Sequence, residues 1–179
     1  MQKKIIWLFG LSGAGKSTIA CAIGEQLKQH GIPCVLLDGD DLRATVNKDL
    51  GYSVEDRKEN IRRAAEFAKL LSQQNMPCIC AFITPFKSLR DLVRHTLQNN
   101  VILFYLDTPL EECIRRDVKG LYKRAIANEL KEFTGITADF EFPENEEKVI
   151  PIQTRGKTPS ECASEILYYL KNKLDKLKN

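Results

Sequence analysis

Apolar residues gather in five short runs along the chain, and each run has the length of a β-strand. The runs cover residues 4–9, 33–38, 76–83, 101–107 and 148–153. Between them, apolar residues recur at helical spacing over 15–30, 54–75, 87–98, 109–128 (with a break) and 158–177. Such alternation predicts an α/β fold, in which a five-stranded parallel sheet is covered by helices on both faces.

Capping signals mark three of the predicted helix starts. Segments 108–111 and 158–161 each place a Thr before a Pro, with a Glu three residues after the Thr. This arrangement predicts a capping box with Pro at the first helical position. Segment 53–56 carries a weaker form of the signal. The last helix places Cys162, Ile166, Leu170 and Leu174 on one side, which indicates a structural helix that faces the core.

A glycine-rich segment separates the first strand from the first helix. Residues 10–18 read GLSGAGKST and match the phosphate-binding pattern G-x-x-x-x-G-K-[ST], the P-loop. The backbone N–H groups of such a loop, and the helix N-terminus after it, favour an anion. Lys16 is expected to reach the outer phosphates, and the Ser17 hydroxyl is expected to ligate Mg²⁺. The residues expected to bind the triphosphate are Gly10, Ser12, Gly13, Ala14, Gly15, Lys16, Ser17 and Thr18.

Composition and charge limit the remaining choices. The 179 residues suit one domain over 1–179, and 43% hydrophobic and 28% charged residues are typical of a soluble globular protein. A net charge of +3 does not indicate a nucleic-acid partner, and no apolar stretch is long enough to span a membrane. The six cysteines lie mostly in apolar stretches, as reduced core cysteines do. We therefore expect a cytoplasmic protein.

Two aspartates follow the second predicted strand, at the sheet edge where ligands bind in such folds. In a phosphotransferase, one carboxylate can hold Mg²⁺ through water while another accepts the proton of the attacking hydroxyl. Asp38 and Asp40 are alternate positions at a strand end, so we expect both to point to the same side. The alternative is an acidic turn, which the presence of a P-loop makes the less favoured interpretation.

Basic residues are candidates for holding further anions. Arg57 and Asn60 share one face of a predicted helix, and Arg43 follows the aspartates, so together they suit a second anionic group. Solvated helix charges explain the same spacing equally well. Segment 115–124 contains five basic residues and predicts either a lid that closes over phosphates or a charged surface helix.

These segments together resemble the adenylylsulfate (APS) kinase family. Beyond the P-loop, the resemblance is carried by segments 38–43, 47–53, 55–63, 81–86, 119–123, 133–136 and 143–145. It implies a three-layer P-loop kinase fold with a mobile lid at roughly 115–145. It implies transfer of the ATP γ-phosphate to the ribose 3′-hydroxyl of adenosine 5′-phosphosulfate (APS), with ATP and Mg²⁺ as cofactors. It also implies a homodimer and a role in sulfate assimilation or sulfonation.

The resemblance further implies a role for each matching residue. Asp40 is expected to be the base for the 3′-hydroxyl, with Lys16 and Asp38 as further catalytic residues and Asp38 holding Mg²⁺ through water. Arg115 is expected to contact ATP. The residues expected to contact the acceptor are Asp40, Arg43, Tyr52, Arg57, Asn60, Ile83, Thr84, Lys119 and Phe133. Among them, Arg43, Arg57 and Asn60 are expected to hold the phosphosulfate. The rings of Tyr52 and Phe133 are expected to enclose the adenine.

The chain departs from the family pattern at several positions. Thr84 stands where the family usually has Ser, a position described in some members as a phosphorylated intermediate, although direct in-line transfer needs no intermediate. Tyr52 replaces a frequent Phe, Val118 replaces a usual Pro, and segment 139–142 also differs. One alternative is therefore an APS-kinase-like enzyme with another acceptor, such as cytidine diphosphoramidate in capsule synthesis. Another is a non-catalytic module that binds a nucleotide to regulate a partner.

Overall fold

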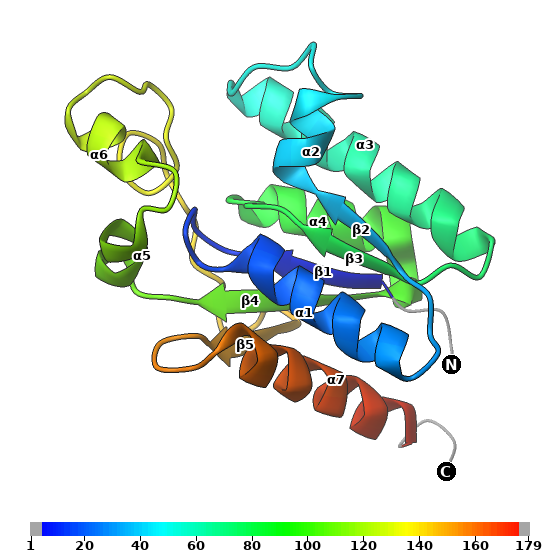
Figure 1. Ribbon diagram of the computed structural model, residues 1–179. Coiled ribbons are helices and arrows are strands. Elements are labelled where there is room, and N and C mark those ends of the chain that lie inside the picture. The colour runs from blue at the N-terminus through cyan, green and yellow to red at the C-terminus, as the bar shows by residue number, and fades with distance from the viewer. Residues whose placement is uncertain (1–4, 176–179) are drawn as a thin grey trace.

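A five-stranded parallel sheet forms the centre of the computed structural model, which describes residues 5–175 (Figure 1). The strands are β1 (Ile5–Phe9), β2 (Val35–Asp38), β3 (Cys78–Ala81), β4 (Val101–Asp107) and β5 (Val149–Gln153). Their order in the sheet is β2-β3-β1-β4-β5, and every pair of neighbours is parallel. Each predicted strand is confirmed, although residue 4 lies outside the described residues.

Helices cover both faces of this sheet (Figure 1). α1 (Lys16–Gln29) and α7 (Pro159–Asp175) pack on one face, and α3 (Val54–Gln73) and α4 (Lys87–Leu97) pack on the other. The helix predicted over 109–128 is divided into α5 (Leu110–Arg116) and α6 (Leu121–Ile126), as the break indicated, and a 3₁₀ turn, η1 (Gln98–Asn100), precedes β4. The three-layer α/β/α fold is confirmed. None of the described helices is long and apolar enough to cross a membrane.

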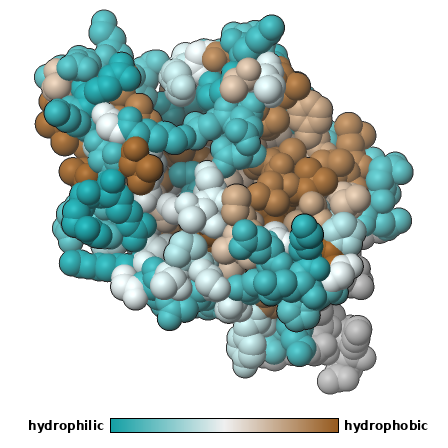
Figure 2. All heavy atoms as spheres, viewed as in Figure 1, coloured by the Kyte–Doolittle hydropathy of each residue, from teal (hydrophilic) through white to brown (hydrophobic). Residues whose placement is uncertain are grey.

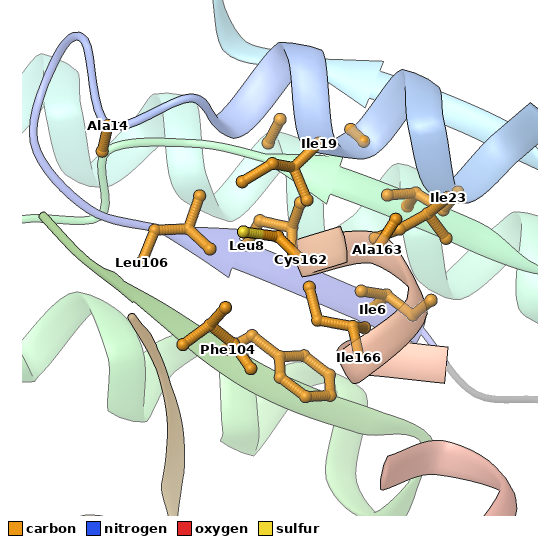
Figure 3. Packing of buried hydrophobic residues seen from close by; sticks show 14 of the residues in the cluster. Ile6, Leu8, Ala14, Ile19, Ile23, Phe104, Leu106, Cys162, Ala163 and Ile166 are labelled. Carbon is orange, nitrogen blue, oxygen red and sulfur yellow. The ribbon is translucent and has the colours of Figure 1, made fainter. Parts of the chain in front are cut away.

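Successive residues of the central strand β1 serve different cores, because side chains alternate between the faces of a sheet. Ile6 and Leu8 pack with α1 and α7, whereas Trp7 and Phe9 pack with α3 and α4. Figure 3 shows the first of these cores, where side chains of α1 and α7 meet over β1 and β4. All five residues of β1 are buried, which explains its continuous apolar sequence and anchors the P-loop that follows it.

Two of the three capping predictions are confirmed. The Ser53 hydroxyl accepts a hydrogen bond from the Asp56 N–H at 3.1 Å, at the start of α3. At the start of α7, the Thr158 hydroxyl accepts from the Glu161 N–H (3.2 Å), and the Glu161 carboxylate accepts from the Thr158 N–H (2.7 Å). These are the reciprocal bonds of a capping box.

The third capping prediction, at residues 108–111, is wrong. α5 begins at Leu110, its N-cap is Pro109, and no side chain caps it. The buried Thr108 hydroxyl lies instead 2.5 Å from the Thr154 hydroxyl and donates to the Ala14 carbonyl at 3.4 Å. Its hydroxyl therefore ties the end of β4 to β5 and to the P-loop, because long-range partners outcompete the local cap.

A short helix that the sequence pattern does not predict, α2 (Gly39–Ala44), begins directly after β2. Asp38 is its N-cap, and the Asp38 Oδ1 accepts a hydrogen bond from the Asp40 N–H at 2.9 Å. Asp40 therefore lies in the first turn of a helix, and the prediction that both aspartates belong to one extended segment is wrong. Asp is favoured at an N-cap, and six residues are too few to show helical periodicity.

Candidate active site

A cleft of about 860 Å³ opens at the carboxyl ends of the strands. The strand order reverses at β1, which has β3 on one side and β4 on the other, and ligands bind at such switch points. Figure 1 shows the P-loop between α1 and β1, with α5 and α6 on one side of it and α2 and α3 on the other. The volume is near the upper end of the range for small-molecule sites, roughly 300–1,000 Å³, which suits two substrates.

All but one of the residues predicted to form the site line this cleft, although they come from distant parts of the chain. Gly10 is the exception. The residues brought together are Ser12, Gly13, Ala14, Gly15, Lys16, Ser17, Thr18, Asp38, Asp40, Arg43, Tyr52, Arg57, Asn60, Ile83, Thr84, Arg115, Lys119 and Phe133.

The P-loop turns its carbonyl groups toward the protein. Each of the five carbonyls from Gly10 to Ala14 accepts a hydrogen bond from a side chain. Lys16 Nζ donates to the carbonyls of Gly10 (3.2 Å) and Leu11 (2.7 Å). The Tyr122 hydroxyl donates to Ser12 (2.9 Å), Arg116 Nη1 to Gly13 (3.3 Å) and the Thr108 hydroxyl to Ala14 (3.4 Å). Apart from those of Gly10 and Ala14, which donate to carbonyl groups, the amide groups are therefore the polar face that this loop offers to a phosphate.

Glycine makes this path of the backbone possible. Gly13 has a φ of 73° and Gly15 a φ of 94°, values that side chains rarely allow. A Cβ on Gly13 would also lie 3.1 Å from the Cys113 carbonyl oxygen, so the loop rests directly on α5. The P-loop is thus packed against the helix that leads into the predicted lid.

Lys16 has an unusually low pKa for a lysine. Desolvation of its ammonium group by burial lowers the pKa from 10.5 to about 8, and the nearby charges of Asp40 and Asp38 act in the opposite direction. The influence of both carboxylates shows that the P-loop lysine and the two aspartates share one electrostatic environment. A bound phosphate would add negative charge and favour the protonated form.

Ser17 and Asp38 have the chemistry that Mg²⁺ requires. The Ser17 hydroxyl donates to Asp38 Oδ2 at 2.5 Å, so two hard oxygen ligands lie side by side. Mg²⁺ usually keeps several waters and is held by one or two protein oxygens together with substrate phosphates. Within residues 5–175, no group of three or more His, Cys, Asp or Glu side chains could hold a metal. The residues present fit a hydrated ion shared with phosphates.

The predicted base, Asp40, is paired with a residue of the predicted lid. Lys119 Nζ lies against Asp40 Oδ2, and both side chains are more than half exposed. The hydrogen bond to Asp40 raises the pKa of Lys119 and keeps the lysine charged. Exposed ion pairs contribute little to stability, about 0–1 kcal/mol, so a substrate group can displace this one readily.

Arg43 holds the turn that presents Tyr52. Its Nη1 donates to the Gly51 carbonyl at 2.6 Å and to the Leu50 carbonyl at 3.3 Å. Its guanidinium carbon also lies 4.6 Å from the centre of the Tyr52 ring, within cation–π range. The exposed Tyr52 ring therefore has a charged, supporting residue on one face.

Arg57 links α3 to the predicted lid. Its Nε donates to the Tyr52 carbonyl at 2.8 Å, its Nη1 donates to the Thr134 hydroxyl at 2.7 Å, and its Nη2 donates to the Glu132 carbonyl. Burial is the main reason that the pKa of Arg57 is lowered from its ordinary value, followed by the charge of Arg43. Because Arg57 is buried, the alternative of a solvated helix charge is wrong for this residue.

The remaining acceptor-side residues differ in their surroundings. Asn60 is buried and accepts a hydrogen bond from Asn47 Nδ2 at 2.9 Å, which closes the loop between α2 and α3 onto α3. Phe133 packs its ring edge-on against Tyr122, with the ring centres 4.9 Å apart. Arg115 is exposed at the rim and pairs with Glu112, so its predicted contact with ATP stays a prediction.

Several lining residues are missed by the sequence reasoning. Thr154, Gly156, Lys157 and Pro159 follow β5 and line the cleft. The rule that ligands bind at the carboxyl ends of strands could have identified this loop as well. Arg116 and Tyr122 hold the P-loop from more than a hundred residues away, and no local pattern reveals such contacts.

Comparison with known proteins shows which family the chain belongs to. The family model described as adenylylsulphate kinase matches residues 2–151. The chain belongs to the adenylylsulfate kinase family. As a member of this family, it is a P-loop phosphotransferase that uses ATP.

Several relatives in this family match nearly the whole chain. A probable adenylyl-sulfate kinase of Pseudomonas aeruginosa is 47% identical over 91% of this chain and 75% of its own length. The adenylyl-sulfate kinase of Clostridium acetobutylicum is 44% identical over 93% of this chain and 82% of its own. The bifunctional enzyme NodQ of Rhizobium tropici is 44% identical over 96% of this chain, which spans only 27% of that longer protein.

The solved structures agree with this assignment. The structure of the Mycobacterium tuberculosis APS kinase CysC in complex with AMPPNP and APS superposes with a TM-score of 0.90 at 36% identity, over 95% of this chain and 98% of that one. A shikimate kinase from Acinetobacter baumannii, at 18% identity and a TM-score of 0.58, shares the fold alone.

Proposed function

We propose that this protein transfers the γ-phosphoryl group of ATP to the 3′-hydroxyl of adenosine 5′-phosphosulfate, in sulfate assimilation. The observation that carries the proposal is the convergence of a P-loop with Asp40 and the arginines Arg43 and Arg57 in one cleft. Asp40 is close enough to Lys16 to influence its pKa, so a donor phosphate and an acceptor hydroxyl can meet between them. Arg43 and Arg57 supply the positive charge that a phosphosulfate needs.

In this reaction the chain supplies positioning, charge and a base. The P-loop amides and Lys16 hold the β- and γ-phosphates in line with the acceptor. Asp40 accepts the proton of the 3′-hydroxyl as its oxygen forms the new bond to phosphorus, and the bond from phosphorus to ADP breaks. Ser17 directly and Asp38 through water would hold Mg²⁺, which would supply positive charge beside the phosphates. The acceptor adenine stacks on the exposed face of Tyr52 and against Phe133.

The segment over roughly 115–145 acts as a lid in this proposal. It contacts the donor loop through Arg116 and Tyr122 and the acceptor side through Lys119, Glu132 and Thr134. Before the 3′-hydroxyl can reach Asp40, Lys119 must leave that carboxylate. The released ammonium group is then free to turn to the phosphates, where negative charge develops.

A panel of acceptors tests the proposal. Purified protein with ATP and Mg²⁺ is assayed against APS, a cytidine-diphosphate-linked compound and unmodified adenosine 5′-phosphate. Efficient phosphorylation of APS is the expected result. Turnover of the CDP-linked compound without turnover of APS would show that the acceptor is another activated nucleotide, and turnover of none would favour a regulatory module.

A homodimer and a cytoplasmic location complete the proposal. A hexameric APS kinase from Thiobacillus denitrificans, 26% identical with a TM-score of 0.69, is an assembly of related chains. Figure 2 shows hydrophobic surface gathered beside β2 and α3, where Leu36, Phe67 and Leu70 are 39%, 39% and 58% exposed. A second copy covering this face would bury it. The molar mass in solution should fall to that of one chain in a Leu70→Glu variant, and a monomeric wild type would contradict the dimer.

A further inference from the structure

The loop between β3 and α4 is held by hydrogen bonds at three successive residues. The Ile83 carbonyl accepts from the Gly10 N–H at 3.3 Å. The Thr84 hydroxyl accepts from the indole Nε1 of Trp7 at 3.0 Å, and the Pro85 carbonyl accepts from Arg90 Nη1 at 3.3 Å. All three loop residues line the cleft. A wall of the site is therefore fixed from inside the protein before any substrate arrives.

Thr84 is the strained member of this wall. Its φ is 44°, in the left-handed region, and its side chain is almost completely buried. Of the six non-glycine residues with positive φ in the described part of the chain, Thr84 alone is β-branched. A β-branched residue is a genuine outlier there, and such strain persists only where the surroundings over-determine the conformation.

Trp7 supplies that constraint from the central strand. Its indole is fully buried and stacks on Phe82, with ring centres 5.0 Å apart and planes inclined by 22°. A buried indole N–H needs an acceptor, and leaving it unpaired is costly. The Thr84 hydroxyl is that acceptor. The only tryptophan of the sequence thus joins the rigid core to the wall of the cleft.

The position of this wall is on the acceptor side. Asp38 at the end of β2 pairs in register with Ala81 at the end of β3, so the loop after β3 lies beside the turn that carries Asp40. The contact is close, because a Cβ on Gly39 would lie 3.1 Å from the Phe82 ring. Displacing this loop would therefore change the space beside the predicted base.

We propose that Trp7 and Thr84 are positioning residues, whose mutual hydrogen bond sets the wall against which the acceptor nucleotide binds. The identity of that acceptor rests on the function proposed above. In this role the Thr84 hydroxyl is a hydrogen-bond acceptor for the indole and does not carry a phosphoryl group. Thr84 is only 1% exposed, which leaves little room for a phosphoryl group on this oxygen.

Three substitutions test whether the Thr84 hydroxyl positions the wall or carries a phosphoryl group. Thr84→Val keeps the shape of the side chain and removes the hydroxyl, Thr84→Ser keeps the hydroxyl, and Trp7→Phe keeps an aromatic ring and removes the N–H. We expect Thr84→Val and Trp7→Phe each to raise the KM for the acceptor about tenfold, with the KM for ATP and the kcat within about twofold of wild type. Thr84→Ser should retain wild-type values. The double variant should be no worse than the poorer single variant, because both remove the same bond.

A spectroscopic measurement makes the test independent of turnover. With one tryptophan in the chain, a ¹H–¹⁵N correlation spectrum contains one indole N–H resonance. This resonance should stay at its hydrogen-bonded, downfield position in Thr84→Ser and move upfield in Thr84→Val. Thr96→Val in α4 and Tyr105→Phe in β4 are the matched controls, and neither should alter the acceptor KM.

Two outcomes would overturn the proposal. Loss of kcat in Thr84→Val with full activity in Trp7→Phe would identify the hydroxyl as a chemical participant. An unmoved indole resonance in Thr84→Val would show that the hydrogen bond is absent. Failure of the proposed function can be told apart from failure of this proposal. If the proposed function is wrong, the wild type does not phosphorylate APS, but the indole resonance still reports on the hydrogen bond.

Discussion

The donor and acceptor walls of the cleft are built in different ways. The donor wall is one continuous segment, residues 10–18, whose conformation is set by its glycines and by the buried strand before it. The acceptor wall is assembled from α2, α3, the loop after β3 and the segment after α5. The donor wall can therefore be recognised from a local pattern, whereas the acceptor wall exists only once the chain has folded.

The two walls also differ in which of their polar groups are already paired before a ligand binds. In the P-loop, side chains occupy the carbonyl groups and leave amides to meet a phosphate. On the acceptor side, the residues expected to bind the substrate already bind one another or the lid: Lys119 pairs with Asp40, and Arg57 donates to Glu132 and Thr134. In the proposed reaction, acceptor binding exchanges these contacts and is therefore coupled to the position of the proposed lid.

The first test of the difference between the two walls is a substitution at Asp40, where the walls meet. Asp40→Asn removes the proposed base and keeps the size of the side chain. We expect kcat to fall by about 10²–10⁴, since general-base catalysis contributes this much. Binding of an ATP analogue should be nearly unchanged, because the donor wall is intact. Turnover with ATP and APS, together with calorimetric titration of the analogue, measures both.

Asp41→Asn is the matched control, because Asp41 is the exposed neighbour in the same helix α2. It should retain wild-type turnover. If Asp40→Asn is as active as wild type, Asp40 is not the base, and the two walls do not meet at this residue.

The second test separates acceptor from donor binding. Arg57→Lys keeps the charge but loses the planar fork that reaches Tyr52, Glu132 and Thr134 together. Charge-assisted hydrogen bonds are worth about 1.5–3 kcal/mol, so the KM for the acceptor should rise about tenfold to a hundredfold. The KM for ATP should change little.

Arg62→Lys, on the exposed side of α3, is the control and should leave both constants unchanged. A thermal unfolding scan shows whether Arg57→Lys acts through the site or through the fold. An equal rise in both KM values would mean that the walls are not independent.

The contrast between the walls explains how far the sequence could predict the molecule. The five strands follow from apolar runs, because both faces of the sheet are buried, and the P-loop follows from residues adjacent in sequence. The start of α2 at Asp38 could not be predicted in this way, because it depends on local competition between an extended and a helical backbone. The hydrogen-bond partner of Thr108 could not be predicted either, because it is a residue distant in the chain. Trp7 and Thr84 are 77 positions apart, and their hydrogen bond is visible only in the folded protein.

The third test concerns the donor wall alone. In the ligand-free protein the pKa of Lys16 is about 8, so its ammonium group is present below this pH and lost above it. Phosphate groups prefer the charged form, and above pH 8 binding must therefore take up a proton. The dissociation constant of an ATP analogue should be nearly constant at lower pH and then rise by up to about tenfold per pH unit.

Calorimetry in two buffers with different ionisation enthalpies measures the proton uptake directly. Lys16→Arg, which stays charged, should remove the uptake. Release of protons on binding, or a flat profile through pH 8 in the wild type, would contradict the assignment of this pKa to Lys16.

The smallest effect is expected at Tyr52, where the acceptor wall is most exposed. The ring is 58% exposed, and the guanidinium carbons of Arg43 and Arg57 lie 4.6 and 6.0 Å from its centre. Aromatic stacking is worth about 0.5–1.5 kcal/mol, so Tyr52→Ala should raise the KM for the acceptor by about twofold to twelvefold. Tyr52→Phe keeps the ring and should change it by less than about twofold, because the hydroxyl adds little to stacking. A loss in Tyr52→Phe as large as the loss in Tyr52→Ala would show that the hydroxyl reads the base. The acceptor wall would then differ from that of family members with Phe at this position.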